Sequence, residues 1–66
     1  MKVRNPGVEC KLIGSDGNVY AIIGAVARSL YAAGLKSEAV VWGERARACK
    51  SYDEVLQEAM ATVEVT

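Results

Sequence analysis

The chain has 66 residues, of which 52% are hydrophobic and 24% are charged, and its eight basic and eight acidic residues cancel. This composition is that of one small globular domain. A balanced charge lacks the basic surface that binding to nucleic acid or to an anionic membrane requires. Histidine is absent, which removes the commonest metal ligand and general base. We therefore expect no enzyme activity and no cofactor.

No targeting or membrane segment is expected. Residues 1–10 carry charges and a Pro–Gly turn where a signal peptide would need an apolar region. The longest uncharged apolar stretch, 19–27, is far shorter than the ~20 residues that span a bilayer. Cys10 and Cys49 form no C-x-x-C motif, so we expect buried thiols, with a disulfide or a reactive thiol as the alternatives. The sequence thus predicts a soluble, cytoplasmic protein.

A loose lead-in and a strand are expected at the start of the chain. Residues 1–7 include a turn signal at Asn5–Pro6–Gly7. The stretch 8–13, "VECKLI", then alternates between apolar and charged side chains, which is typical of a half-buried strand. We predict a lead-in over 1–7 and a single domain over 8–66 that begins with this strand.

The glycine-rich stretch "LIGSDGNVYAI" follows. Asp16–Gly17 between apolar runs is a hairpin signal, but the apolar residues after Asn18 repeat every 3.6 residues, which favours a helix capped by Asn18 or Asp16. The stretch has no phosphate-binding motif, no basic residue and no calcium-loop glutamate at the required spacing. A capping corner is therefore the first interpretation, and a small-ligand or anion site over 14–20 is the alternative. The residues of that site would be Asp16, Gly17, Asn18 and Tyr20.

The first helix is predicted over 18–33, because its apolar residues recur at spacings of three and four. The stripe consists of Val19, Ile22, Ile23, Val26, Leu30 and Ala33. Gly34 stands where a left-handed C-terminal cap belongs, and Leu35 with Leu30 would supply the apolar contact of a Schellman ending.

A second helix is predicted to begin after Ser37 as its N-cap. Basic residues gather near its C-terminal end, where the helix dipole favours cations. Gly43 in its interior costs about 1 kcal/mol relative to alanine, which suggests that a small residue is required there. Its apolar seam would consist of Ala39, Trp42, Ala46 and Cys49, and its basic cluster of Arg45, Arg47 and Lys50.

A third helix and a second strand complete the predicted fold. Ser51 and Glu54 have the spacing of a capping box, and residues 62–66 alternate like the first strand. The apolar stripe of this helix would be Tyr52, Val55, Leu56, Ala59, Met60 and Val63, opposite a solvated acidic face of Asp53, Glu54 and Glu58. The expected fold is α+β: a small βαααβ domain whose two-stranded sheet packs against three helices.

Two stretches, "KLIGSDGNVYAIIGAVARSLYAAGL" and "SYDEVLQEAMATVEV", resemble a family of short, uncharacterised proteins from bacterial and mobile-element genomes. The family pattern is roughly L-I-G-x-D-G-N-A-F-x-I, then A-L-x-x-A-G, D-Y-D-x-L-L and V-x-V. The resemblance covers about 8–65; this chain departs from the pattern at Val19–Tyr20 and at Ser51. Because the family has no established activity, the resemblance implies the element boundaries and no functional residue.

One face of the helix over 18–33 lacks the polar character that solvent exposure would favour. This face lies opposite the apolar stripe and has a single charge; its residues are Ala21, Gly24, Ala25, Arg28, Tyr31 and Ala32. Either the other elements cover it, or it is a surface for self-association with Arg28 at its rim. Since a chain this short is marginally stable alone, we expect a homodimer, or a binder of another protein, that uses this face and the strand edges.

Overall fold

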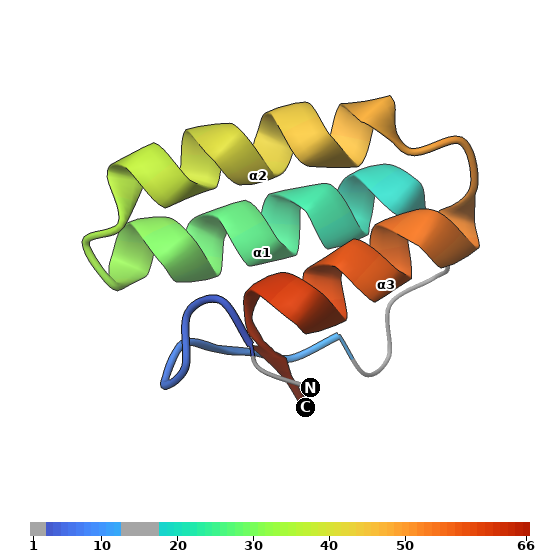
Figure 1. The fold of residues 1–66 in the computed structure, drawn as a ribbon. Helices are drawn as coiled ribbons and strands as arrows, with labels where there is room; N and C mark the ends of the chain where they lie inside the picture. The colour runs from blue at the N-terminus through green and yellow to red at the C-terminus, as the bar shows by residue number, and fades with distance from the viewer. Residues whose placement is uncertain (1–2, 13–17) are drawn as a thin grey trace.

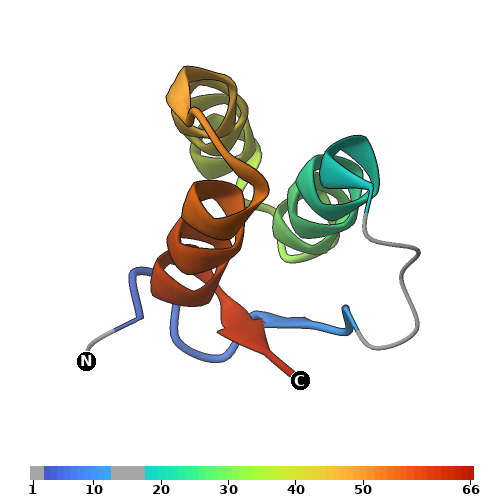
Figure 2. The same cartoon turned by 90° about the vertical axis from the view of Figure 1, so that its right-hand side faces the viewer.

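A computed structural model describes residues 3–12 and 18–66. Within them the order is β1 (Glu9–Cys10), α1 (Val19–Ala32), α2 (Lys36–Ala48), α3 (Tyr52–Thr62) and β2 (Glu64–Val65). All three of these helices pack on one another, β1 lies against α1, and β2 lies against α3 (Figures 1 and 2). The chain is therefore a small α+β domain of βαααβ order, as the sequence predicted.

The sheet is parallel and very short. Parallel strands need a long crossover connection, which here is the whole helical part of the chain. The paired region covers only two residues of each strand, so it is shorter than the predicted strands over 8–13 and 62–66, and Ile13 lies outside the described residues. The register places Glu9 opposite Glu64 and Cys10 opposite Val65.

Both ends of α1 follow from local side-chain chemistry. The Asn18 side chain accepts a hydrogen bond of 2.8 Å from the Tyr20 N–H and is the N-cap. At the other end Gly34 adopts φ +80°, and the N–H groups of Gly34 and Leu35 donate to Tyr31 and Leu30 at 3.0 and 2.9 Å. These two bonds are those of a Schellman motif. The predicted helix and its glycine ending are confirmed, whereas the other N-cap candidate, Asp16, lies outside the described residues.

The predicted start of α2 is wrong. The helix begins at Lys36 with Leu35 as its N-cap, and Ser37 lies inside the first turn. Leu35 forms no side-chain capping bond, but its carbonyl accepts from the Ala39 N–H at 3.0 Å. The Schellman turn explains the early start, because it already reverses the chain at Gly34 and directs Leu35 onto the core.

The predicted start of α3 is confirmed. The Ser51 hydroxyl accepts from the Glu54 N–H at 3.2 Å, as a capping residue should. Glu54 in turn accepts through Oε1 from the Lys50 N–H at 3.0 Å, one residue earlier than in the usual capping box. The two bonds together satisfy backbone donors on both sides of the N-cap.

Ser51, which caps α3, and Ser37, which does not cap α2, provide a matched test of N-capping. Ser51→Ala is expected to lower the free energy of unfolding by about 1 kcal/mol, because the Glu54 N–H loses its acceptor. Ser37→Ala should change it by less than about 0.5 kcal/mol, because alanine is the better helix former inside a first turn. Urea denaturation of both variants measures the difference, and equal losses would contradict the assignment.

The core lies between the helices and the sheet, with Trp42 as its largest fully buried side chain. The Trp42 indole Nε1–H donates to the Ile23 carbonyl at 3.0 Å, which ties α2 to α1. The predicted seam of α2 is buried as far as Ala46, and Cys49 is half-buried. On α3 the buried stripe is narrower than predicted, because Met60 lies on its flank and is 45% exposed.

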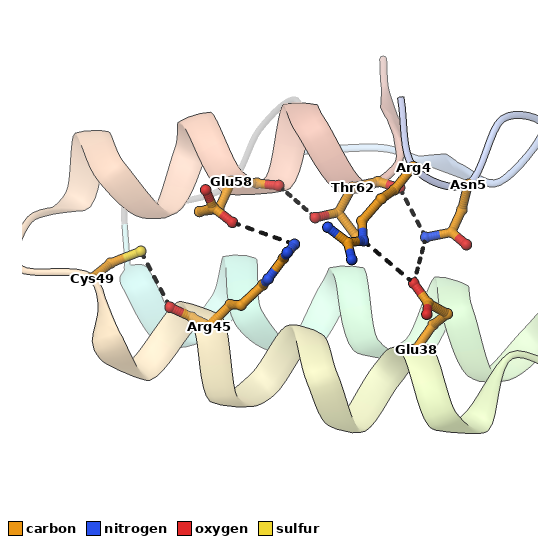
Figure 3. A network of polar contacts seen from close by, with 7 residues as sticks. All are labelled: Arg4, Asn5, Glu38, Arg45, Cys49, Glu58 and Thr62. Carbon is orange, nitrogen blue, oxygen red and sulfur yellow. Dashed lines mark hydrogen bonds and ion pairs between the residues drawn. The ribbon is translucent and has the colours of Figure 1, made fainter. Parts of the chain in front are cut away.

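The N-terminal segment is bonded to the domain. The backbone N–H groups of Arg4 and Asn5 donate to the carbonyls of Ala61 and Thr62 at 2.9 and 3.0 Å. The Asn5 side-chain amide donates to Thr62 O at 3.1 Å and to Glu38 Oε1 at 3.3 Å (Figure 3). These bonds join the segment to the C-terminal end of α3 and to α2, whereas the sequence suggested a loose lead-in.

Candidate functional site

The structure separates the two interpretations of the uncovered face of α1. We name Ala21, Gly24, Ala25, Arg28, Tyr31 and Ala32 the outer face. Gly24 and Ala25 are half-buried, and the other four residues are exposed. Tyr31 is 51% exposed to solvent. In Figure 2, α2 and α3 lie to one side of α1, and the strands lie below it. The interpretation that other elements of the fold cover this face is therefore wrong for the described part of the chain.

The outer face has an unusual chemistry for a solvent-exposed surface. Its single charge belongs to Arg28, whose guanidinium Nη1 lies 3.8 Å from the position that a Cβ on Gly24 would take. The arginine side chain thus folds back along the helix toward Gly24. Arginine and tyrosine are the residue types that protein interfaces concentrate, whereas glutamate and lysine, which typical exposed helices carry, are absent from this face.

The strand edges offer much less. Each strand pairs over two residues, so an edge presents only a short row of backbone groups to a further chain. The N–H groups of Glu64 and Thr66 already donate to Val8 and Cys10 at 2.8 and 3.0 Å. Among the surfaces that the sequence proposed, the outer face of α1 therefore comprises more residues than the two paired strands do.

The predicted ligand corner is only partly within the described residues. Asn18 is occupied as the N-cap of α1, while Asp16 and Gly17 lie outside the described ranges. Tyr20 is 80% exposed. Tyr20 also borders a cleft that the sequence did not predict.

This cleft, which we name the helix-end cleft, has a volume of about 340 Å³. It lies where α1 and α3 begin and α2 ends, and these three helix ends share one side of the molecule in Figure 1. Its parts are far apart in the sequence, so no local pattern could reveal it; the basic cluster at the end of α2 was the only signal. The lining residues are Val19, Tyr20, Ile23, Ala46, Arg47, Cys49, Lys50, Ser51, Tyr52 and Val55.

A second depression, the α2–α3 groove, has a volume of about 500 Å³. The acidic residues of α3, which the sequence assigned to a solvated face, lie along it opposite α2. Glu58 forms an ion pair of 3.8 Å with Arg45 across the groove, and both side chains remain more than one-third exposed (Figure 3). The lining residues are Arg45, Ala48, Cys49, Asp53, Glu54, Gln57 and Glu58.

Both cysteines are free thiols. Cys10 is buried, and the half-buried Cys49 donates through Sγ to the Arg45 carbonyl at 3.4 Å. Desolvation raises the pKa of the Cys49 thiol, and the negative charges of Glu54 and Glu58 raise it further. Because the thiolate is the reactive form, this environment disfavours a nucleophilic role. The described residues also contain no group of three or more potential Cys, Asp or Glu metal ligands.

No protein-family model, curated protein or solved structure matches the chain. The resemblance to short bacterial proteins thus stays a prediction. Across the described helices, none combines the length and apolar character that crossing a membrane requires. The described residues form a small α+β domain in which four of the six outer-face residues of α1 are exposed.

Proposed function

We propose that this protein is a non-enzymatic interaction module that forms a homodimer through the outer face of α1. The observation that carries the proposal is the exposure of a helix face with one charge in a domain this small. A domain of 66 residues buries only about 60% of the surface that its unfolded chain exposes, a smaller share than a larger domain buries, so a partner subunit would add stability. The raised pKa of the Cys49 thiol and the absence of histidine support a role without chemistry.

The order of residue sizes along the outer face favours a second copy as the occupant. Small residues occupy its N-terminal half, at Ala21, Gly24 and Ala25, whereas the large side chains of Arg28 and Tyr31 follow in the C-terminal half. A two-fold axis that pairs α1 antiparallel with itself therefore sets large side chains of one copy over small residues of the other. Such an interface is self-complementary, as a symmetric dimer requires.

The setting of this function is part of the same proposal. Free thiols at Cys10 and Cys49 support a reducing compartment, and we place the protein in the cytoplasm. The resemblance to proteins from mobile-element genomes supports an accessory role. The alternative occupant of the outer face is a different protein, which the experiment below distinguishes from a second copy.

The dimer is tested by adding bulk at the centre of the outer face. Light scattering after size exclusion is expected to give twice the chain mass of 7.0 kDa for the wild type and 7.0 kDa for Gly24→Leu. Among the described residues outside the backbone of its own helix, a Cβ on Gly24 meets the end of the Arg28 side chain at 3.8 Å and no other atom within 4 Å. Leucine is also the better helix former by about 0.8 kcal/mol, so the monomer should keep its fold.

Gly43→Leu is the matched control, because Gly43 is also a helix-interior glycine and has no atom within 4 Å of an added Cβ. It should gain the same helix propensity and remain dimeric. A wild-type monomer at the highest attainable concentration would overturn the homodimer and leave a different protein as the occupant. A Gly24→Leu variant that remains dimeric would move the interface away from the outer face.

A further inference from the structure

The helix-end cleft combines an apolar floor with an aromatic rim. Ala46 and Val55 are buried and Ile23 is half-buried, so the floor is closed by core residues. Tyr20 and Tyr52 are exposed and belong to different helices, α1 and α3. The volume of about 340 Å³ is at the small end of the range of ligand pockets, which suits a molecule of one or two rings.

Among the described residues that line this cleft, the charged ones are the cations Arg47 and Lys50. Within the described ranges neither side chain forms an ion pair, since the pairs there are Arg4–Glu38 and Arg45–Glu58. Two helices, α1 and α3, begin at the cleft and direct the positive ends of their dipoles toward it, whereas only α2 ends there. The acidic residues of α3 line the α2–α3 groove, and the carboxylate of one of them, Glu54, also accepts from the N–H of Lys50 at 3.0 Å.

We propose that the helix-end cleft is a binding site for a small aromatic anion. The ring system lies on the apolar floor between Tyr20 and Tyr52, where aromatic side chains pack against it. The anionic group faces Arg47 and Lys50, which donate charge-assisted hydrogen bonds to it. The site does not use the outer face of α1, so it stands or falls separately from the proposed dimer.

A pair of probes tests the requirement for an anion. Anilinonaphthalene sulfonate carries an aromatic body and a negative charge, and neutral phenylnaphthylamine has a closely similar body without the charge. The sulfonate is expected to bind saturably, one per chain, and at least roughly tenfold more tightly than the neutral probe. Two-dimensional NMR should place the shift changes at the amides of Tyr20, Ser51 and Tyr52.

A charge-removal pair tests the assignment of the cations. The double variant Arg47→Gln/Lys50→Gln is expected to weaken sulfonate binding roughly tenfold or more, with the neutral probe unaffected. Lys36→Gln is the matched control, because Lys36 is an exposed cation at the opposite end of the same helix, and it should bind like the wild type. Thermal unfolding of each variant verifies that the fold is intact.

Three results would overturn the site: no saturable binding, equal affinity for both probes, or an unchanged affinity in the double variant. Shift changes confined to the outer face of α1 would overturn it as well. None of these results bears on the oligomeric state that light scattering measures, so failure of the anion site leaves the dimer proposal standing.

Discussion

Trp42→Ala is expected to lower the free energy of unfolding by about 3–5 kcal/mol. Trp42 is 1% exposed, is the largest fully buried side chain of the described core, and contacts α1 through the hydrogen bond to the Ile23 carbonyl. A chain of 66 residues has a total stability of roughly 3–10 kcal/mol. The substitution therefore removes between about a third and all of that stability.

Trp42→Phe separates packing from hydrogen bonding at the same position. Phenylalanine keeps an aromatic ring in the core but loses the indole N–H that donates to Ile23 O at 3.0 Å. The expected loss, about 1–2 kcal/mol, sums one net hydrogen bond and a small cavity. Urea unfolding followed by far-ultraviolet circular dichroism measures both variants without relying on tryptophan emission. A loss below about 1 kcal/mol for Trp42→Ala would contradict the role of Trp42 as the core anchor.

The sequence predicted α1 well because each of its ends is set by residues that are close together in the sequence. Asn18 supplies the capping oxygen and Gly34 supplies the left-handed backbone, and each acts on neighbours within five positions. The start of α2 was missed although it is close in sequence. Ser37 has good capping chemistry, but the turn at Gly34 had already directed the chain into the helix at Lys36.

The candidate sites were harder to predict because both depend on tertiary packing. Packing decides which elements cover a helix face and which helix ends come together. Composition identified the outer face of α1, but only the packing of α2 and α3 on the opposite side decided that it is uncovered. The helix-end cleft brings Tyr20 beside Arg47 and Tyr52, residues whose separation in the sequence exceeds any local window. Sequence periodicity describes which way a side chain faces, and it contains no information on which helix ends meet.

The N-terminal segment shows a third kind of non-local effect. The last carbonyls of a helix have no partners within the helix, and at the end of α3 two of them, on Ala61 and Thr62, accept from Arg4 and Asn5. The opposite end of the chain thus caps α3. Arg4 and Asn5 also reach Glu38 on α2 (Figure 3), so one short segment joins two helices to the sheet that follows it.

Removal of residues 1–5 is therefore expected to lower the free energy of unfolding by about 2–4 kcal/mol. The estimate takes about 0.5–1 kcal/mol for each of the four hydrogen bonds that join the segment to α3 and α2; the turn bond from the Val8 N–H to Asn5 O is lost as well. Two of these bonds come from backbone N–H groups and two from the Asn5 amide, which donates to Thr62 O and Glu38 Oε1. Urea denaturation of the truncated and full-length chains measures the loss.

Two point variants grade the contributions within the same segment. Asn5→Ala keeps both backbone bonds and should lose about 1–2 kcal/mol with the two side-chain bonds. Arg4→Ala removes only an exposed ion pair of 3.8 Å with Glu38, so its loss should stay below about 0.5 kcal/mol. Unchanged stability in the truncated chain would restore the loose lead-in that the sequence suggested. We expect the loss of unfolding free energy to be largest for the truncated chain, smaller for Asn5→Ala and smallest for Arg4→Ala. That order would assign the effect to the hydrogen bonds that cap α3.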